Sequence, residues 1–319
     1  MSETGTAAFL RAVGDGDIER VRDLLAADPG LANAVGPHPY WGGRPQALHI
    51  AIETKRRDMF DLLLDAGADP DGRNGEYDLW SPLMLALNRD RADMRDELIR
   101  RGARIGLVEA LLMKDDVAVD ALLADGLPPM APNGGSILAF ARTPYAIDQL
   151  IALGAPIDAK DRWGVTPVEA MSRAGEDGGL LVRHMMRHGV TPDAEAFARL
   201  GDRDMLAALV ENDPALARRD DLLMAAVDGR HHDLVRWLLS MGADANARAA
   251  GQSRQSALHN AAWNGDLEMV QSLVDAGADL HVRDAEHDAT PRGWAETAAT
   301  ITNNPACVEV AAWLRAQGG

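Results

Sequence analysis

Several residue types are scarce in this chain, and each scarcity excludes a class of structure or partner. The 319 residues include one cysteine, Cys307, which cannot form an intramolecular disulfide and excludes a zinc site built from several cysteines. Basic residues are outnumbered, with 32 Lys and Arg against 49 Asp and Glu, and the formal net charge is -17. This balance argues against binding to nucleic-acid backbones or anionic lipid. Because a disulfide and a cysteine-rich zinc site are both excluded, the fold must be held together by the packing of its side chains.

Targeting and membrane-spanning segments are also lacking in the sequence. The first ten residues, MSETGTAAFL, contain no basic stretch followed by an apolar one, and no apolar run is long enough to span a bilayer. We therefore expect a cytoplasmic protein with no membrane partner. Lysine is rare whereas arginine and alanine are abundant, which is typical of a GC-rich bacterial genome. The hydrophobic content of 47% predicts a folded chain.

What the sequence does contain is a repeated segment. The chain from Ser256 reads SALHNAAWNGDLEMVQSLVDAGADL, and the chain from Gln46 reads QALHIAIETKRRDMFDLLLDAGADP, which aligns with it without a gap. Leu-His, an apolar run at i, i+3, i+4 spacing and Gly-Ala-Asp together predict two short helices and a turn. Such short helices are unstable alone, so neighbouring copies must bury their apolar faces. Drifted copies begin at Ser81, Leu107, Asp148 and Asp221.

The ends of the predicted helices carry recognisable motifs. Thr166-Pro167 and Thr290-Pro291 are favourable helix starts, because Thr caps the helix and Pro fits its first position. Glycines that follow the second helices are Gly67, Gly154, Gly242 and Gly277. With these motifs the chain resembles the ankyrin repeat family over almost its entire length. The resemblance implies an all-α fold, a solenoid of about nine or ten stacked helix-turn-helix repeats with a concave face. It implies no single function, because the family binds unrelated partners.

The regularity of the repeats varies along this predicted single solenoid of residues 1–319. We expect an N-terminal capping repeat and long connector over 7–45, regular repeats over 46–104 and 203–289, degenerate central repeats over 105–202, and a C-terminal capping repeat over 290–319. The last helix should end near Gln317. The copy from Ser136 is short in its first helix, and the copy from Thr166 carries extra residues around 175–179. Weaker stacking should make the centre the easiest segment to open.

Aromatic residues and one long connector give the clearest pointer to a binding surface. The resemblance places eight of the 14 aromatic residues in connectors or on the concave side: Tyr40, Trp41, Tyr77, Trp80, Phe140, Trp163, Trp263 and Trp294. Large flat side chains there would bury apolar area at small entropic cost, although Trp80 and Trp163 could instead cover the ends of neighbouring repeats. The connector VGPHPYWGGR combines aromatics, a histidine and an arginine, a mixture that a loop merely crossing a gap does not need. We therefore predict a binding site made of His38, Tyr40, Trp41, Arg44, Tyr77, Trp80 and Trp263.

Catalytic and metal-binding motifs are weakly supported. His184 and His188 stand four residues apart, but RHMMRH lacks the glutamate of HExxH and a third ligand, so we interpret them as surface histidines and expect no metal or cofactor. The family resemblance implies that His49 and His259 hydrogen-bond neighbouring backbone. Cys307 has no catalytic motif around it and is predicted to be a buried, inert thiol.

Two functions remain open from the sequence. The favoured one is a non-catalytic interaction module that holds a protein or peptide in the concave groove, where an acidic surface with aromatic anchors would suit a partner with basic and apolar residues. The alternative is an enzyme or small-molecule-binding protein with a pocket formed by the 35–45 connector and the inner helices. Acid-base candidates for that pocket are His38, Glu53, Asp78 and His259. No spacing demands catalysis, so the first hypothesis is preferred.

Overall fold

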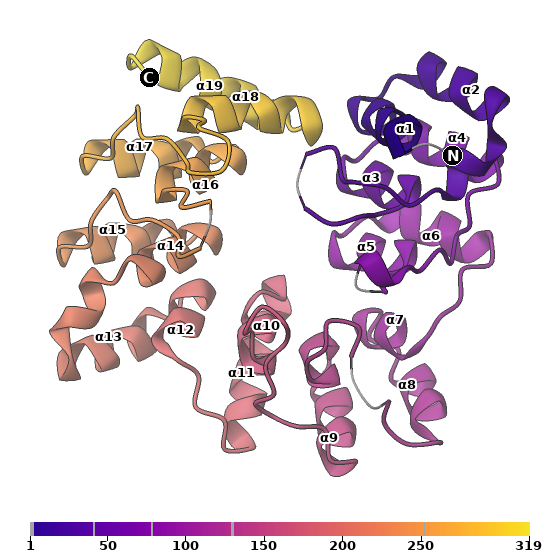
Figure 1. Cartoon of the computed structure of the whole chain (residues 1–319). Helices are drawn as coiled ribbons and strands as arrows, with labels where there is room; N and C mark the ends of the chain where they lie inside the picture. The colour runs from indigo at the N-terminus through magenta and orange to yellow at the C-terminus, as the bar shows by residue number, and fades with distance from the viewer. Residues whose placement is uncertain (1–2, 41, 78, 129–130, 252) are drawn as a thin grey trace. The chain divides into compact units, whose positions relative to one another are not determined.

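The computed structural model describes residues 3–40, 42–77, 79–128, 131–251 and 253–319 (Figure 1). Regular structure in these ranges consists of α-helices and short 3-10 turns, and the one pairing of extended backbone found there is an isolated bridge between Arg248 and Ser256. Across these ranges, every helix falls short of the length and apolar character that crossing a membrane requires. The all-α prediction is confirmed.

The chain divides into two compact units, Met1–Pro167 and Val168–Gly319, which we describe separately. The division falls within residues 105–202, the segment whose repeats are most degenerate in sequence. That one continuous solenoid runs over residues 1–319 stays a prediction.

The described residues of the first unit form four helix pairs and a further helix. Within it, α1, α3, α5 and α7 contact one another in order, and each also contacts the second helix of its own pair (Figure 1). Every residue of α3 is buried, because neighbours cover it on several sides. The elements are α1 (Glu3–Asp15), α2 (Ile18–Ala27), η1 (Pro29–Asn33), α3 (Ala47–Glu53), α4 (Arg57–Asp65), η2 (Gly75–Tyr77), α5 (Pro82–Asn88), α6 (Ala92–Arg100), α7 (Leu107–Leu112), α8 (Asp116–Leu123), η3 (Ile137–Phe140) and α9 (Pro144–Ala152).

The second unit repeats the same plan, with α12, α14, α16 and α18 in contact in order (Figure 1). Its last helix ends at Ala316 and is capped by Gln317, as predicted. The elements are α10 (Pro167–Ser172), η4 (Gly175–Asp177), α11 (Gly178–Arg187), α12 (Ala194–Leu200), α13 (Arg203–Asn212), η5 (Pro214–Arg218), α14 (Asp220–Asp228), α15 (His232–Ser240), α16 (Ala257–Trp263), α17 (Leu267–Asp275), α18 (Pro291–Ile301) and α19 (Pro305–Ala316).

Each unit holds a large cluster of buried apolar side chains. One cluster runs from Phe9 to Ala103 and the other from Ala194 to Leu314. Burial of these side chains is the main stabilising contribution in a stack of short helices. Polar caps add to it; for example, Ser81 accepts a hydrogen bond from the Met84 backbone at the start of α5.

The irregular copies adopt the local structures that their lengths impose. The copy from Ser136 has only the 3-10 turn η3 where other repeats have a first helix, which confirms the shortening seen in the sequence. Extra residues in the next copy form the 3-10 turn η4 and the start of α11. Both departures lie in the segment predicted to stack less regularly.

Candidate binding site

The long connector of the first unit folds back on itself before α3. The His38 backbone N–H donates to the Gly43 carbonyl at 3.0 Å, and the Gly36 N–H donates to the Pro45 carbonyl at 3.3 Å. From α1, the Arg11 side chain donates to the Pro39 carbonyl at 3.3 Å. The connector is therefore a closed loop held against the first helix pair.

A buried pair of polar side chains fixes this loop to α3. His38 Nε2 lies 2.9 Å from Glu53 Oε2, and the two side chains are 0% and 3% exposed. The Tyr40 N–H donates to His38 Nδ1 at 3.2 Å, so Nε2 carries the hydrogen that faces Glu53. On the other oxygen, the Tyr77 hydroxyl donates at 2.8 Å. Burial alone would raise the pKa of Glu53, but hydrogen bonds from His38 and Tyr77 outweigh it, so the pKa is lowered and Glu53 is ionised.

Tyr40 ties the tip of the connector to the end of α1. Its hydroxyl donates to Asp15 Oδ1 at 2.6 Å, and the Arg11 guanidinium lies 5.0 Å from the ring centroid. The ring packs so tightly on Gly14 that a Cβ there would lie 2.8 Å from it. Burial and the bond to Asp15 raise the pKa of the Tyr40 hydroxyl above its usual value, so the tyrosine stays protonated.

Arg44 and Tyr77 link this connector to the next one. Arg44 Nε is 2.5 Å from Glu76 Oε2, and a Cβ at Gly43 would lie 3.1 Å from the Tyr77 ring. Tyr77 also packs edge-to-face on His49, with ring centroids 5.1 Å apart. The two connectors therefore form one ordered surface.

Trp80 follows the second of these connectors in the sequence, just before α5. It packs edge-to-face on Phe140 with centroids 6.0 Å apart and contacts the apolar core of the first unit, while part of its ring remains exposed. We call Tyr40, Arg44, Tyr77 and Trp80 the connector surface, because all four side chains are partly exposed and lie on the two linked connectors. His38 lies beneath it and is buried.

The other predicted residues are not part of the connector surface as the structure describes it. Trp41 and Asp78 lie outside the described residues. Trp263 belongs to the second unit, where it packs edge-to-face on Trp294 with centroids 5.7 Å apart. The Trp294 indole N–H donates to Asp284 at 2.9 Å. Among the described residues, the structure thus brings together His38, Tyr40, Arg44, Tyr77 and Trp80, whereas Trp263 is part of a separate aromatic pair.

The predicted bracing by the two Leu-His histidines is confirmed. His49 Nε2 lies 3.0 Å from the Trp80 carbonyl, and His259 Nε2 lies 3.0 Å from the Ala289 carbonyl. Each histidine thus joins its helix to the connector of the following repeat. Burial lowers the pKa of both rings, so both are neutral in the folded chain near pH 7.

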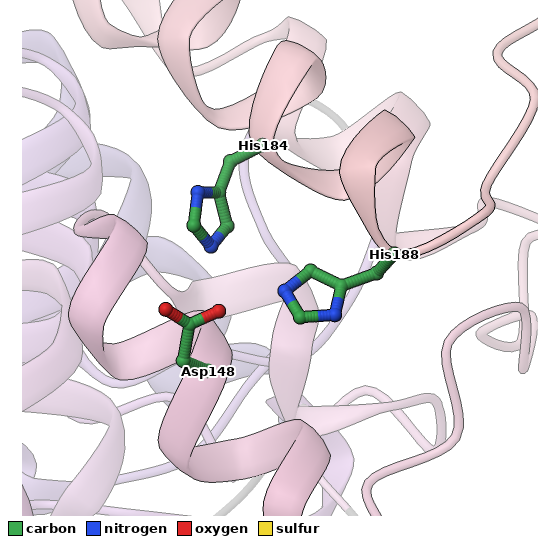
Figure 2. Close-up of side chains that lie close together, drawn as sticks. All are labelled: Asp148, His184 and His188. Carbon is green, nitrogen blue, oxygen red and sulfur yellow. The ribbon is translucent and has the colours of Figure 1, made fainter.

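The interpretation of His184 as a surface residue was wrong. Figure 2 shows His184 of α11 and His188, the residue that caps the end of that helix, and their ring centroids are 5.2 Å apart. His188 is exposed, but His184 is only 7% exposed, because it lies on the same helix face as the buried Leu181. Asp148, also drawn in Figure 2, belongs to α9 of the first unit.

The buried thiol was predicted correctly. Cys307 is fully buried in α19, and its Sγ donates to the Trp263 carbonyl at 3.3 Å. Burial raises its pKa, which keeps it protonated and unreactive.

Comparisons with known proteins agree with the repeat pattern. A family model of ankyrin repeats in three copies matches residues 194–284, and a single ankyrin repeat model matches residues 47–75. The E3 ubiquitin-protein ligase XB3 of Oryza sativa subsp. japonica is 31% identical over 175 residues, which is 54% of this chain and 36% of that protein. Protein PhlB of Serratia liquefaciens is 40% identical over 101 residues, 31% of this chain and 43% of PhlB. Human Rabankyrin-5 is 30% identical over 145 residues, 41% of this chain and 12% of Rabankyrin-5. Each match covers less than half of the relative's length.

Proposed function

Because the chain is an ankyrin repeat protein, we propose that it is a non-catalytic binding module that holds a protein or peptide segment on the connector surface and the neighbouring first helices. Ankyrin repeats generally mediate contacts between proteins, and the relatives include an E3 ubiquitin-protein ligase. The observation that carries the proposal is the locking of the 35–45 connector. The buried His38–Glu53–Tyr77 network and the Arg44–Glu76 pair tie its described residues to α3 and to the next connector.

A locked connector favours binding for an entropic reason. A free loop would lose conformational freedom when a partner ordered it, whereas this loop has already been ordered during folding. Tyr40, Tyr77 and Trp80 then present fixed, partly exposed rings, and such rings are frequent energetic anchors of protein interfaces. The acidic balance of the chain supports a partner segment with basic and apolar residues.

The same geometry weakens the enzymatic alternative. His38 and Glu53 are two of the predicted acid-base candidates, but their side chains are buried and bonded to each other. A general acid or base must come within hydrogen-bond reach of its substrate. This pair therefore supports loop anchoring better than proton transfer.

Affinity capture with matched variants tests the proposal. The chain and its Arg44→Glu variant would each be used to capture proteins from the native host, followed by mass spectrometry. Arg22→Glu is the control, because Arg22 is an exposed arginine of α2 that pairs with Glu19, away from both connectors. We expect proteins retained by the wild type and by the control to be lost with Arg44→Glu. Retention of the same proteins by all three chains would place binding away from the connector surface.

A further inference from the structure

A hollow in the second unit gathers arginines in a chain that is acidic overall. It has a volume of about 840 Å³ and lies along three successive turns, which join α10 to α11, α12 to α13, and α14 to α15. Five arginines line it, against three aspartates: Arg173, Arg183, Arg199, Arg203 and Arg230, with Asp202, Asp204 and Asp228. This cluster of arginines was missed in the sequence, because its members are spread over nearly 60 residues, from 173 to 230.

The turns that form this hollow are tightly interlocked. His231 Nε2 lies 2.8 Å from the Arg199 carbonyl of the preceding repeat. A Cβ at Gly201 would lie 2.5 Å from the His231 ring, and one at Gly229 would lie 2.3 Å from the Arg199 carbonyl oxygen. Only glycine permits these approaches, so the floor of the hollow is a fixed structure.

The arginines that line the hollow differ in whether carboxylates of the chain pair with them. Arg199 is 13% exposed and pairs with Glu195 at 2.8 Å and Asp228 at 3.1 Å, so it serves the fold. Arg183 has a more distant partner, Asp202, at 3.8 Å. In the part of the chain that the structure describes, the guanidinium groups of Arg173 and Arg203 have no carboxylate partner, although the Arg203 group lies 5.5 Å from the centroid of the Trp237 ring.

An equivalent position in the first unit shows that this lack of pairing is not a property of the repeat. Arg57 is the first residue of α4, as Arg203 is of α13. Arg57 lies 2.9 Å from Asp61 and 3.2 Å from Asp93. In the second unit, Ala207 stands where Asp61 follows Arg57, and Asp233, at the position of Asp93, pairs with Arg236 instead of Arg203.

We propose that the hollow binds an acidic segment of a partner protein through Arg173, Arg183 and Arg203. Guanidinium groups form strong two-point hydrogen bonds with carboxylates. A volume of about 840 Å³ accommodates several side chains, whereas a single small anion would fill little of it. The net negative charge of the chain opposes this contact, but salt weakens repulsion from charges farther than about 8 Å, so the side chains that line the hollow have the largest influence on binding. This site lies in the second unit and does not rest on the function proposed for the connector surface.

Anisotropy of a fluorescein-labelled oligoglutamate peptide, titrated with the full chain, tests this proposal. We expect binding that weakens about tenfold or more in the double variant Arg173→Gln with Arg203→Gln. The exposed Asp204 lines the hollow, so Asp204→Asn should tighten binding. Arg22→Gln removes the same kind of charge from the first unit and should leave binding unchanged.

Three results would contradict the proposal. The proposal is overturned if oligoglutamate binds no better than an uncharged peptide of equal length, or if Arg22→Gln weakens binding as much as the double variant. Displacement of the peptide by an equal concentration of inorganic phosphate would indicate a simple anion site and would also contradict it. Thermal melting controls for folding, and the tightening expected for Asp204→Asn cannot arise from unfolding.

Discussion

Arg57 of the first unit and Arg203 of the second begin equivalent helices, yet the protein uses them differently. Arg57 pairs with Asp61 of its own helix and with Asp93 of α6, whereas Arg203 packs on an aromatic ring and has no carboxylate partner in the described chain. Other charged groups of the first unit are also used by the fold. In the first unit, Glu53 is buried and bonded on both oxygens, and Arg56 donates to the Gly14 carbonyl at 2.8 Å.

This comparison separates charges that hold the fold from charges that are available to a partner. A charge that is buried and paired should matter for stability, because its removal leaves the other group unpaired in a medium of low polarity. A charge that is exposed and unpaired should matter little for stability and can be used for binding. Stability and binding measurements on matched variants therefore test the comparison.

The largest expected loss of stability follows from Glu53→Ala. The change leaves His38 and the Tyr77 hydroxyl without their buried acceptor, so we expect the free energy of unfolding to fall by about 3 to 5 kcal/mol. Urea unfolding followed by circular dichroism measures it. Glu76→Ala is the control, because Glu76 is largely exposed, and it should cost no more than about 1 kcal/mol. Equal effects of the two changes would show that the buried network does not anchor the connector.

A pH dependence of stability is the next largest effect. Burial lowers the pKa of His49 and His259 below 6.5, so on acidification the unfolded chain takes up protons that the folded chain cannot. The two histidines therefore contribute fully to the free energy of unfolding above about pH 6.5, and this contribution declines as the pH falls further. Glu53, with its lowered pKa, adds a further loss below 4.5. Urea unfolding over a pH series should show the decline, and the double variant His49→Gln with His259→Gln should flatten its first part. A wild-type stability that stays level from about pH 7 to about pH 5 would contradict the assignment.

Local opening should also differ along the chain. Residues 105–202 contain the shortened and extended repeats, so their amide hydrogens should exchange sooner than those of 46–101 or 221–279. Hydrogen exchange followed by mass spectrometry compares the three segments in one experiment. Protection of the centre equal to that of both flanks would show that the irregular repeats stack as well as the regular ones.

The smallest expected effect separates the two equivalent arginines. Arg57→Gln should lower the free energy of unfolding by about 0.5 to 1 kcal/mol, because it removes two partly exposed ion pairs. Arg203→Gln should change it by less than about 0.5 kcal/mol. Both values come from urea unfolding under one set of conditions. A larger loss at Arg203 than at Arg57 would reverse the comparison.

The sequence was sufficient for the fold because the repeats carry local signals. Leu-His, Thr-Pro and the glycine after the second helix each act within a few residues, so their spacing predicts where the helices begin and end. The same locality explains why the bracing by His49 and His259, the burial of Cys307 and the shortened copy from Ser136 could be predicted.

The site was predicted less completely because it depends on which side chains meet across repeats. The connector was recognised from its composition, but the role of Glu53 as the acceptor shared by His38 and Tyr77 requires contacts over 15 and 24 residues. The arginine-lined hollow has no motif, since its residues come from three turns. His184 was placed at the surface because its spacing from His188 was considered without the apolar face of its own helix.

The central claim is that the 35–45 connector is a recognition surface rather than a cover for the core, and Trp41→Ala tests it most directly. Melting temperature and affinity for a partner captured with the wild-type chain should be measured on the same sample. We predict that binding weakens by roughly 2 kcal/mol or more while the melting temperature is nearly unchanged. A fall in stability of about 3 to 5 kcal/mol, with unchanged affinity per folded molecule, would contradict the claim and show that the residue serves the fold.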